Sequence, residues 1–275
     1  QRNGHVVAMT GDGVNDALAL KDADIGVAMG NGAQATKAVA QLVLLDGRFS
    51  HMPSVLAEGR RVIGNVERVA NLFVAKNVMS LVAIVSAALF TLPFPFLPRH
   101  LTLVSAVTIG IPAFFLALGP NKRRYVPGFL RRVLRFAVPA GLVSGIVVLV
   151  SYVLARNEVG APPASECLVK TEGSNAVANV ICWQPSSAAT IALLFTAFWI
   201  LVVLSRPFRP WKALLVGSMV ALAALAFILP IGQTFFNFDL TPTILWQSLL
   251  VGGIGALAIE IIYRTEPAMR AAAGD

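Results

Sequence analysis

Long apolar stretches restrict the fold of this chain more than any other feature. Five of them follow residue 100, each near the length that crosses a bilayer: Leu101–Leu118, Leu134–Leu154, Ala188–Leu204, Ala213–Ile231 and Thr243–Tyr263. A spanning backbone must satisfy its hydrogen bonds internally, so these stretches predict membrane helices. The composition agrees, because 56% of the residues are hydrophobic and 13% are charged, whereas soluble domains are about a quarter charged.

The segment before these spans predicts one long helix. From His51 to about Phe90 there is no proline after Pro53; the first half is polar and basic, and the second half, from Val78, is apolar. The polar half holds Glu58, Arg60, Arg61, Glu67, Arg68 and Lys76. Such a helix would be roughly 55–60 Å long, whereas a bilayer core is about 30 Å thick. We therefore expect a stalk that starts in water and becomes the first of about six crossings.

The first fifty residues predict a cytoplasmic α/β domain. Strand candidates are His5–Met9, Ile25–Met29 and Leu42–Leu45, and helical stretches around Asn15–Asp22 and Ala33–Ala40 lie between them. Strands that alternate with helices predict a parallel sheet with right-handed crossovers.

An acidic loop, Thr10-Gly11-Asp12-Gly13-Val14-Asn15-Asp16, joins the first strand to the first helix. Open α/β sheets bind ligands at such junctions, and glycines let the backbone turn and approach a ligand. Asp12 and Asp16 suit Mg²⁺, which favours one or two carboxylates together with water and phosphate oxygens. Asn15 adds a neutral donor for a phosphate oxygen.

This loop, continued by Ala19-Leu20-Lys21-Asp22-Ala23-Asp24-Ile25-Gly26-Val27-Ala28-Met29-Gly30, resembles the phosphorylation-domain motif of P-type cation-transporting ATPases. The calcium and metal-cation pumps are the most similar branch. The resemblance implies a partial haloacid-dehalogenase-like (Rossmann-type) domain at 1–50, a stalk at 51–92, and the remaining five-helix membrane region with a cytoplasmic tail at 93–275.

The resemblance also implies the chemistry of the loop. Asp12 matches the Mg²⁺ ligand of the family, Asp16 its second carboxylate and Asn15 a phosphate-contacting position, with Thr10 and Gly11 in the same catalytic motif. ATP is the implied substrate: it phosphorylates an aspartate, and hydrolysis of that aspartyl phosphate drives cation transport.

Other parts of the family pattern do not occur in this sequence. They are the DKTGT motif with the phosphorylated Asp, the nucleotide-binding domain, the actuator domain with TGE, and the first membrane helices. We therefore expect the chain to be the C-terminal third of a pump that works as a single polypeptide, and to be inactive by itself, with ATP bound mainly by the other parts.

The second span carries a candidate transport site. Gly110 and Pro112 weaken or remove helical hydrogen bonds and free backbone carbonyls. The span resembles the broken sixth helix of P-type pumps, NLVTDGLPA in calcium pumps. Ser105 stands at the Asn of that pattern, Thr108 keeps its Thr, and Ile109 replaces its Asp.

On the stalk helix, Asn77 matches an Asn ligand of the fifth helix of the family, and Ser80 replaces a Glu. The implied transported-ion site is Asn77, Ser80, Ser105, Thr108 and Pro112; the alternative is that these small side chains serve close helix packing. Both expected acids are missing, so carboxylates come from other helices, the ion is more weakly charged, or the route differs.

Basic residues predict the topology. The formal net charge of +8 is compatible with nucleic-acid binding, but the basic residues cluster beside apolar spans, which is the membrane pattern. The clusters at 121–135 and 205–212 put residues 1–50 and the C-terminus on the cytoplasmic side of a plasma membrane, and the loop 156–187 outside. Glu260, an acid within a late span, is expected to reach the interface or pair with Arg264, a ligand role being the alternative.

Two cysteines, Cys167 and Cys182, lie in this exterior loop. An oxidising exterior favours a disulfide between them.

The sequence therefore predicts an ATP-driven pump for Ca²⁺ or another metal cation, with membrane lipid, the cation and ATP as partners and no nucleic acid. Two alternatives remain: a P-type lipid flippase, which also lacks the calcium-pump carboxylates, and a membrane-anchored phosphatase of the haloacid dehalogenase type.

Overall fold

The computed structural model describes residues 1–119, 128–160 and 176–266, with side chains outside the description at 176–182. The chain separates into two compact units, Gln1–Gly59 and Arg60–Asp275, and each is described by itself.

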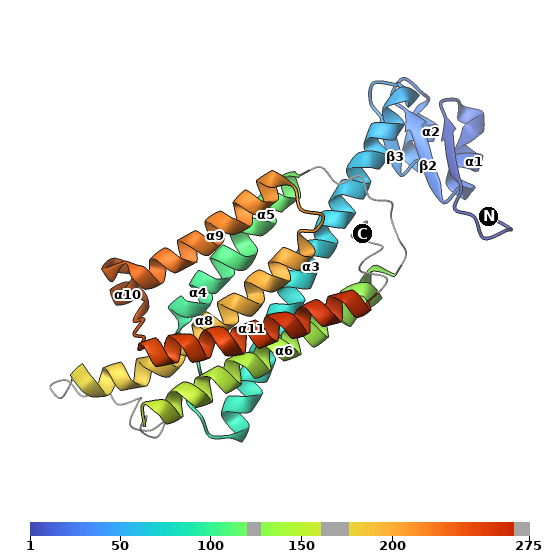
Figure 1. Ribbon diagram of the computed structural model, residues 1–275. Helices are drawn as coiled ribbons and strands as arrows, with labels where there is room; N and C mark the ends of the chain where they lie inside the picture. The colour runs from blue at the N-terminus through green and yellow to red at the C-terminus, as the bar shows by residue number, and fades with distance from the viewer. Residues whose placement is uncertain (120–127, 161–175, 267–275) are drawn as a thin grey trace. The chain divides into compact units, whose positions relative to one another are not determined.

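The first unit contains a parallel sheet of three strands in the order β1-β2-β3 (Figure 1). The strands are β1 (Ala8–Gly11), β2 (Ile25–Met29) and β3 (Leu42–Leu44). The connections hold a 3-10 turn, η1 (Val14–Asp16), and two helices, α1 (Ala17–Asp22) and α2 (Gln34–Val39). The predicted α/β order with parallel pairing is confirmed.

Two strand boundaries differ from the prediction. The first strand starts at Ala8 and runs to Gly11, because Val7 donates its backbone N–H to the Asp24 carboxylate and Gly11 pairs with Ala28 of β2. The third strand ends at Leu44, and Leu45 is 89% exposed. Val7 and Leu45 are apolar, so hydropathy predicts them as strand residues, but both lie outside the hydrogen-bonded sheet.

A 3-10 turn, η2 (Phe49–His51), leads into α3 (Met52–Leu89), a single helix of 38 residues, as predicted. The helices that follow are α4 (Pro98–Ser105), α5 (Ile111–Leu118), α6 (Phe129–Glu158), α8 (Ala176–Leu204), α9 (Pro210–Ile228), α10 (Pro230–Phe236) and α11 (Pro242–Thr265). Within the described residues, six helical stretches are long and apolar enough to cross a membrane. The chain is a multi-pass membrane protein.

The helical spans are longer than predicted at several ends. α6 covers Phe129–Glu158 where Leu134–Leu154 was expected, and α8 begins at Ala176 where Ala188 was expected. Polar residues such as Arg131 and Gln184 continue these helices beyond their apolar centres, which hydropathy alone does not detect. The predicted loop 156–187 is correspondingly shorter.

The second crossing stays helical where an interruption was expected. A π-helical turn, η3 (Ala106–Gly110), joins α4 to α5, and Ile111 donates its N–H to the Ala106 carbonyl five residues earlier. Pro112 follows in the first turn of α5, and because the π turn leads directly into α5, its missing N–H leaves one carbonyl of that turn without its helical donor. The Gly–Pro pair therefore changes the helix type instead of ending the helix.

Glycines set the closest helix contacts. A Cβ on Gly141 of α6 would lie 2.5 Å from the Ala75 carbonyl oxygen of α3, and one on Gly145 would lie 2.6 Å from Val82 Cβ. This G-x-x-x-G spacing lets two membrane helices approach closely, and the sequence analysis missed it. α6, α8 and α11 also pack side by side (Figure 1).

Candidate functional site

The acidic loop of the first unit is shaped by the Asp16 carboxylate. Its Oδ2 atom accepts hydrogen bonds from the backbone N–H groups of Asp12 at 3.1 Å and Gly13 at 3.0 Å. A Cβ on Gly11 would lie 2.6 Å from Asp16 Cβ, so only glycine allows the side chain this close to the loop backbone.

The start of α2 supports the same loop from its other side. The Asp12 carbonyl accepts the backbone N–H of Ala33 at 2.7 Å. A Cβ on Gly32 would lie 2.8 Å from that carbonyl oxygen. Thr36 is fully buried and donates its hydroxyl hydrogen to the Ala33 carbonyl at 2.6 Å. The loop is therefore a backbone-defined structure at the carboxyl end of β1.

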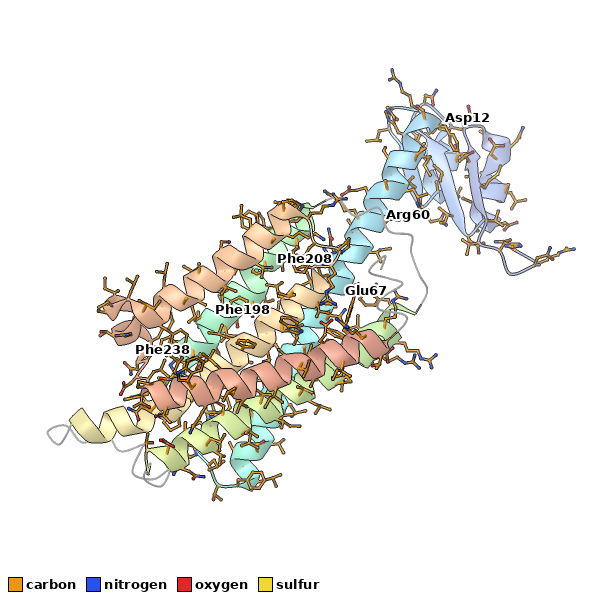
Figure 2. The ribbon with its side chains drawn as sticks, in the orientation of Figure 1. Asp12, Arg60, Glu67, Phe198, Phe208 and Phe238 are labelled. Carbon is orange, nitrogen blue, oxygen red and sulfur yellow. The ribbon has the colours of Figure 1, made fainter. Side chains whose placement is uncertain are left out.

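The two carboxylates of the loop have different surroundings. The Asp12 side chain is exposed (Figure 2), and within the described residues its carboxylate accepts no hydrogen bond. Asp16 is half-buried with one oxygen engaged by the backbone. Asn15 is exposed in η1, and Thr10 and Gly11 form the end of β1.

These residues fit a shared Mg²⁺ site better than a complete one. In the described part of the chain, no three His, Cys, Asp or Glu side chains converge in a group that could hold a metal ion. Mg²⁺ is commonly held by one or two carboxylates, with water and substrate phosphate oxygens completing the shell. Asp12 and the free oxygen of Asp16 can supply the carboxylate part.

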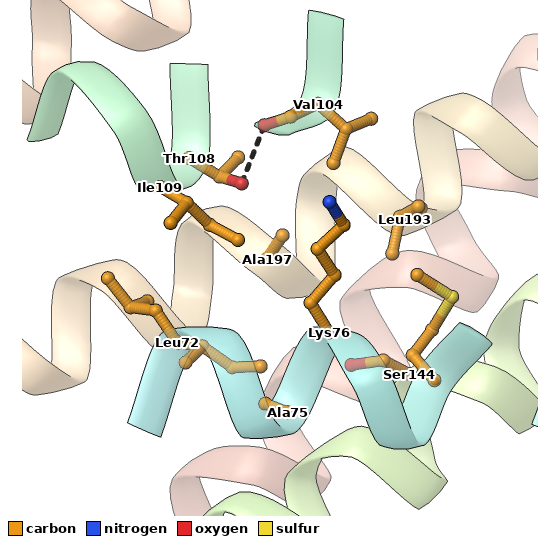
Figure 3. A pocket seen from close by; sticks show the side chains of 11 residues that line it. Leu72, Ala75, Lys76, Val104, Thr108, Ile109, Ser144, Leu193 and Ala197 are labelled. Atoms are coloured by element: carbon orange, nitrogen blue, oxygen red, sulfur yellow. Dashed lines mark hydrogen bonds between the residues drawn. The ribbon is translucent and has the colours of Figure 1, made fainter. Parts of the chain in front are cut away.

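A mainly apolar pocket with three polar lining residues, Lys76, Thr108 and Ser144, lies inside the helix bundle of the second unit (Figure 3). Its free volume of about 30 Å³ can hold a water molecule. The lining side chains come from α3, the α4–η3 crossing, α6 and α8: Leu72, Ala75, Lys76, Met79, Val104, Thr108, Ile109, Ser144, Leu193, Ala197 and Ile200.

Hydroxyl groups supply the polar atoms of this pocket, together with one ammonium. Thr108 donates its hydroxyl hydrogen to the Val104 carbonyl at 2.7 Å, and Ser144 donates to the Ala140 carbonyl at 2.9 Å. A hydroxyl that donates to its own helix keeps lone pairs for another donor or a cation. The Lys76 side chain reaches across the pocket (Figure 3), and its Nζ lies 2.6 Å from Ser105 Oγ.

The structure brings only some of the predicted transport residues together. Thr108 lines the pocket and Ser105 binds Lys76 at its edge. Pro112 is buried in α5. Asn77 is exposed and Ser80 is half-buried on α3, and neither lines this pocket.

Sequence reasoning missed Lys76, which it counted with the solvent-facing half of the stalk. A simple signal was available. Lys76 precedes the helix end at Leu89 by thirteen residues, or about 20 Å, which places it within a 30 Å hydrocarbon core.

A group of polar contacts surrounds the stretch of α3 from Asn65 to Arg68. Glu67 forms a bidentate ion pair with Arg132 of α6, both distances 2.9 Å. Arg68 donates to the Leu204 carbonyl at the end of α8, and Asn65 donates to the Ala117 carbonyl of α5. Three neighbouring helices are thus tied to one stretch of α3 (Figure 2 labels Glu67).

Glu260 pairs with Arg264 at 2.8 Å, as predicted, and also with Arg206 at 2.8 Å. Its carboxylate is therefore engaged by two cations. The predicted disulfide lies outside the described residues, because neither Cys167 nor the side chain of Cys182 is described.

Comparison with known proteins agrees with both parts of the structure. Residues 2–47 match the haloacid dehalogenase-like hydrolase family. The chain is 46% identical to the calcium-transporting ATPase CtpE of Mycolicibacterium smegmatis over 96% of its own length and 33% of that protein. It is 45% identical to the CtpE of Mycobacterium tuberculosis over 96% and 32%.

A probable cation-transporting ATPase, exp7 of Streptococcus pneumoniae, is 39% identical over 52% of this chain and 19% of that protein. The chain thus spans about a third of the length of the curated relatives that it matches along nearly all of its own length. The loop motif, the parallel sheet and the six apolar helices of the described residues agree with this similarity to cation-transporting ATPases.

Proposed function

We propose that this chain is part of an ATP-driven Ca²⁺ pump, in which phosphate chemistry at the acidic loop is coupled to cation movement through the helix bundle. The observation that carries the proposal is the presence, in one chain, of the Asp12–Asp16 loop and of a membrane pocket that holds the Thr108 and Ser144 hydroxyls among apolar side chains. The CtpE relatives named as calcium-transporting ATPases favour Ca²⁺ over other cations.

The loop residues have separate roles in this proposal. Asp12 and the free oxygen of Asp16 hold Mg²⁺, which when bound shields the charge of the phosphoryl oxygens. Asp16 also holds the loop backbone in place. Asn15 contacts a phosphate oxygen, and Thr10 and Gly11 present the loop at the strand end.

In the intact protein, ATP and the phosphorylated aspartate belong to parts not contained in this sequence, so this chain alone is inactive. Residues 1–50 belong to the phosphorylation domain, 51–92 form the stalk, and 93–275 complete the membrane region. The same proposal implies that the pump works as a single polypeptide that contains this chain.

In this proposal, the pump lies in a plasma membrane, with residues 1–50 and the C-terminus in the cytoplasm. The basic side chains of Arg132, Arg206 and Arg264 gather at one end of the bundle, in keeping with the cytoplasmic bias of basic residues. The connection between the end of α6 at Glu158 and the start of α8 at Ala176 faces the exterior, where Cys167 and Cys182 pair.

A lipid flippase is the second candidate. It is favoured by one observation: among the described residues, no acidic side chain lines the pocket. Divalent-ion transport then needs carboxylates from elsewhere in the intact protein, because an ion without nearby negative charge is costly to desolvate.

The test is ATP-driven ⁴⁵Ca²⁺ uptake by the intact protein in sealed vesicles. We expect uptake by the wild type, none by Asp12→Asn, and unchanged uptake by Asp22→Asn, an exposed carboxylate of α1 outside the loop. ATP hydrolysis stimulated by lipid but not by Ca²⁺ would favour the flippase. Cleavage of small phosphate esters with no ion movement would favour a membrane-anchored phosphatase.

A further inference from the structure

One hydrogen bond holds the Lys76 ammonium in the membrane pocket. Its Nζ lies 2.6 Å from Ser105 Oγ, and Ser105 donates its own hydrogen to the Leu101 carbonyl at 2.5 Å. The serine hydrogen is therefore committed, and its lone pair faces the ammonium. Lys76 and Thr108 line the same pocket, and Ser105 stands about one turn before Thr108.

The charge of Lys76 is not balanced by a carboxylate in the described part of the chain. An ammonium has three N–H donors, and Ser105 is the single hydrogen-bond partner that the described residues give it. Glu67, nine residues earlier on α3, is about 13 Å away along the helix and is held by Arg132. A positive charge in an apolar bundle is costly, so its presence marks a functional position.

Two hydroxyls that line the same pocket also suit a metal cation. The Thr108 and Ser144 hydroxyls donate to their own helices, so their oxygen atoms keep lone pairs for another partner. Pro112 has no N–H, so the turn before it has a carbonyl without its helical donor. Two positive charges in such a space repel strongly.

We propose that the Lys76 ammonium is the resident cation of this pocket: it occupies the site when no transported ion is bound and must withdraw when one binds. The inference rests on the proposed cation pump and adds the residue that sets occupancy and affinity. The withdrawal is a side-chain movement, since α3 itself is held against α6 where Gly141 meets Ala75 and Gly145 meets Val82. A lysine stem has the rotatable bonds for it.

A structural bridge is the competing explanation, in which Lys76 merely joins α3 to α4. The two explanations differ in what charge removal does. If Lys76 competes with the ion, removing its charge strengthens ion binding. If Lys76 is only a bridge, removing it loosens the pocket and weakens binding, and a neutral donor in its place restores the bridge.

The experiment measures the Ca²⁺ concentration for half-maximal ATP hydrolysis in the intact protein, with Lys76→Met and Lys76→Gln. Both remove the charge, and Gln keeps N–H donors for Ser105. We expect both variants to lower the half-maximal concentration by about tenfold or more. An unchanged or higher concentration in both variants, or a rise in Met that Gln reverses, would overturn the inference.

Ser105→Ala removes the partner of the ammonium and should lower the half-maximal concentration by a smaller factor. Its matched control is Ser86→Ala on α3, since Ser86 also donates to a carbonyl four residues earlier, that of Val82, at 2.5 Å. The control should not change the concentration; equal effects of the two serine variants would contradict the role of Ser105.

A wild type whose ATP hydrolysis ignores Ca²⁺ would instead overturn the proposed ion. The variants are then compared by thermal unfolding with Ca²⁺, Mn²⁺ or K⁺ alone. A cation-induced rise in Tm that is larger in Lys76→Met than in the wild type supports the inference, and equal rises, or none in either protein, refute it.

Discussion

The acidic loop and the membrane pocket solve opposite electrostatic problems. The loop places the Asp12 carboxylate at the surface, where water already solvates it. The pocket places a lysine ammonium and two hydroxyls among apolar helices, with no acidic lining residue in the described part of the chain. The loop thus attracts a cation with full negative charges, whereas the pocket offers neutral oxygen atoms and a competing positive charge.

The two sites are also positioned by different means. Backbone hydrogen bonds to Asp16 and from Ala33 define the loop. Close helix packing at Gly141 and the ion pair between Glu67 and Arg132 hold the helix that carries Lys76. A substitution should therefore damage the loop through its backbone and the pocket through its helix contacts.

The largest expected effect follows from crowding the loop. In Gly32→Ala, the new Cβ would lie 2.8 Å from the Asp12 carbonyl oxygen and 2.9 Å from Asp12 Cα. Both are backbone atoms, so the loop must shift. We expect ATP hydrolysis by the intact protein to fall by roughly a hundredfold, as when a positioned catalytic group is lost.

The control for this substitution is Gly59→Ala in α3, where an added Cβ meets no atom within 4 Å. It should keep full activity and stabilise the helix by about 0.5–1 kcal/mol. Full activity in Gly32→Ala would contradict a backbone-defined loop.

The next effect compares two ion pairs of the second unit. Arg132 is 6% exposed in its pair with Glu67, whereas Arg264 is 71% exposed in its pair with Glu260. Arg132→Gln should destabilise the protein by roughly 3–5 kcal/mol, since it leaves a poorly solvated carboxylate. Arg264→Gln should cost at most about 0.5 kcal/mol. Thermal unfolding in detergent measures both, and similar Tm losses would refute the distinction.

A smaller loss is expected from separating α3 and α6. Gly141→Ala puts a Cβ 2.5 Å from the Ala75 carbonyl oxygen, and overpacking of this kind costs roughly 1–3 kcal/mol. Gly253→Ala on α11 meets no atom within 4 Å and serves as the control. Thermal unfolding in detergent measures both variants. Equal Tm values for Gly141→Ala and Gly253→Ala would contradict the close packing of α3 against α6.

The smallest effect concerns the start of the first unit. The Val7 backbone N–H, and then the Gln1 side chain, lower the pKa of Asp24 from its ordinary 3.8. A lowered pKa stabilises the fold above the ordinary pKa, and this contribution is lost as the pH falls through the native pKa, below about pH 4. Asp24→Asn should therefore speed amide hydrogen exchange around Val7 slightly at pH 7, and Asp22→Asn should not. Equal exchange rates in both variants would remove Asp24 as a support of β1.

Hydropathy and motif order predicted the larger features of the molecule. The crossing helices, the unbroken α3 and the parallel order of three strands follow from apolar length and alternation, which are local properties. The expected span Ala213–Ile231 was wrong at its end, because α9 stops at Ile228 and Pro230 begins α10. The start of β1 was missed because it depends on Asp24, seventeen residues from Val7.

The pocket was less predictable because its geometry depends on distant partners. A Gly–Pro pair does not reveal whether a helix breaks or adopts a π turn, and here Ile111 bonds to Ala106. A lysine that directly precedes the apolar half of a helix is read as solvent-facing unless its depth is counted from the helix end at Leu89. Its contact with Ser105 joins residues 29 positions apart, and local pattern carries no such information.

The most direct test of the pump account asks whether a membrane hydroxyl controls chemistry at the ATP-hydrolysing site. Thr108→Val keeps the shape of the side chain and removes one oxygen from the pocket. In the intact protein, we predict a half-maximal Ca²⁺ concentration for ATP hydrolysis about tenfold higher, as for loss of a hydrogen-bonding or ligand group worth about 1.4 kcal/mol, with the maximal rate reached at high Ca²⁺. Hydrolysis with the same Ca²⁺ dependence as the wild type would show that this pocket does not bind the transported ion.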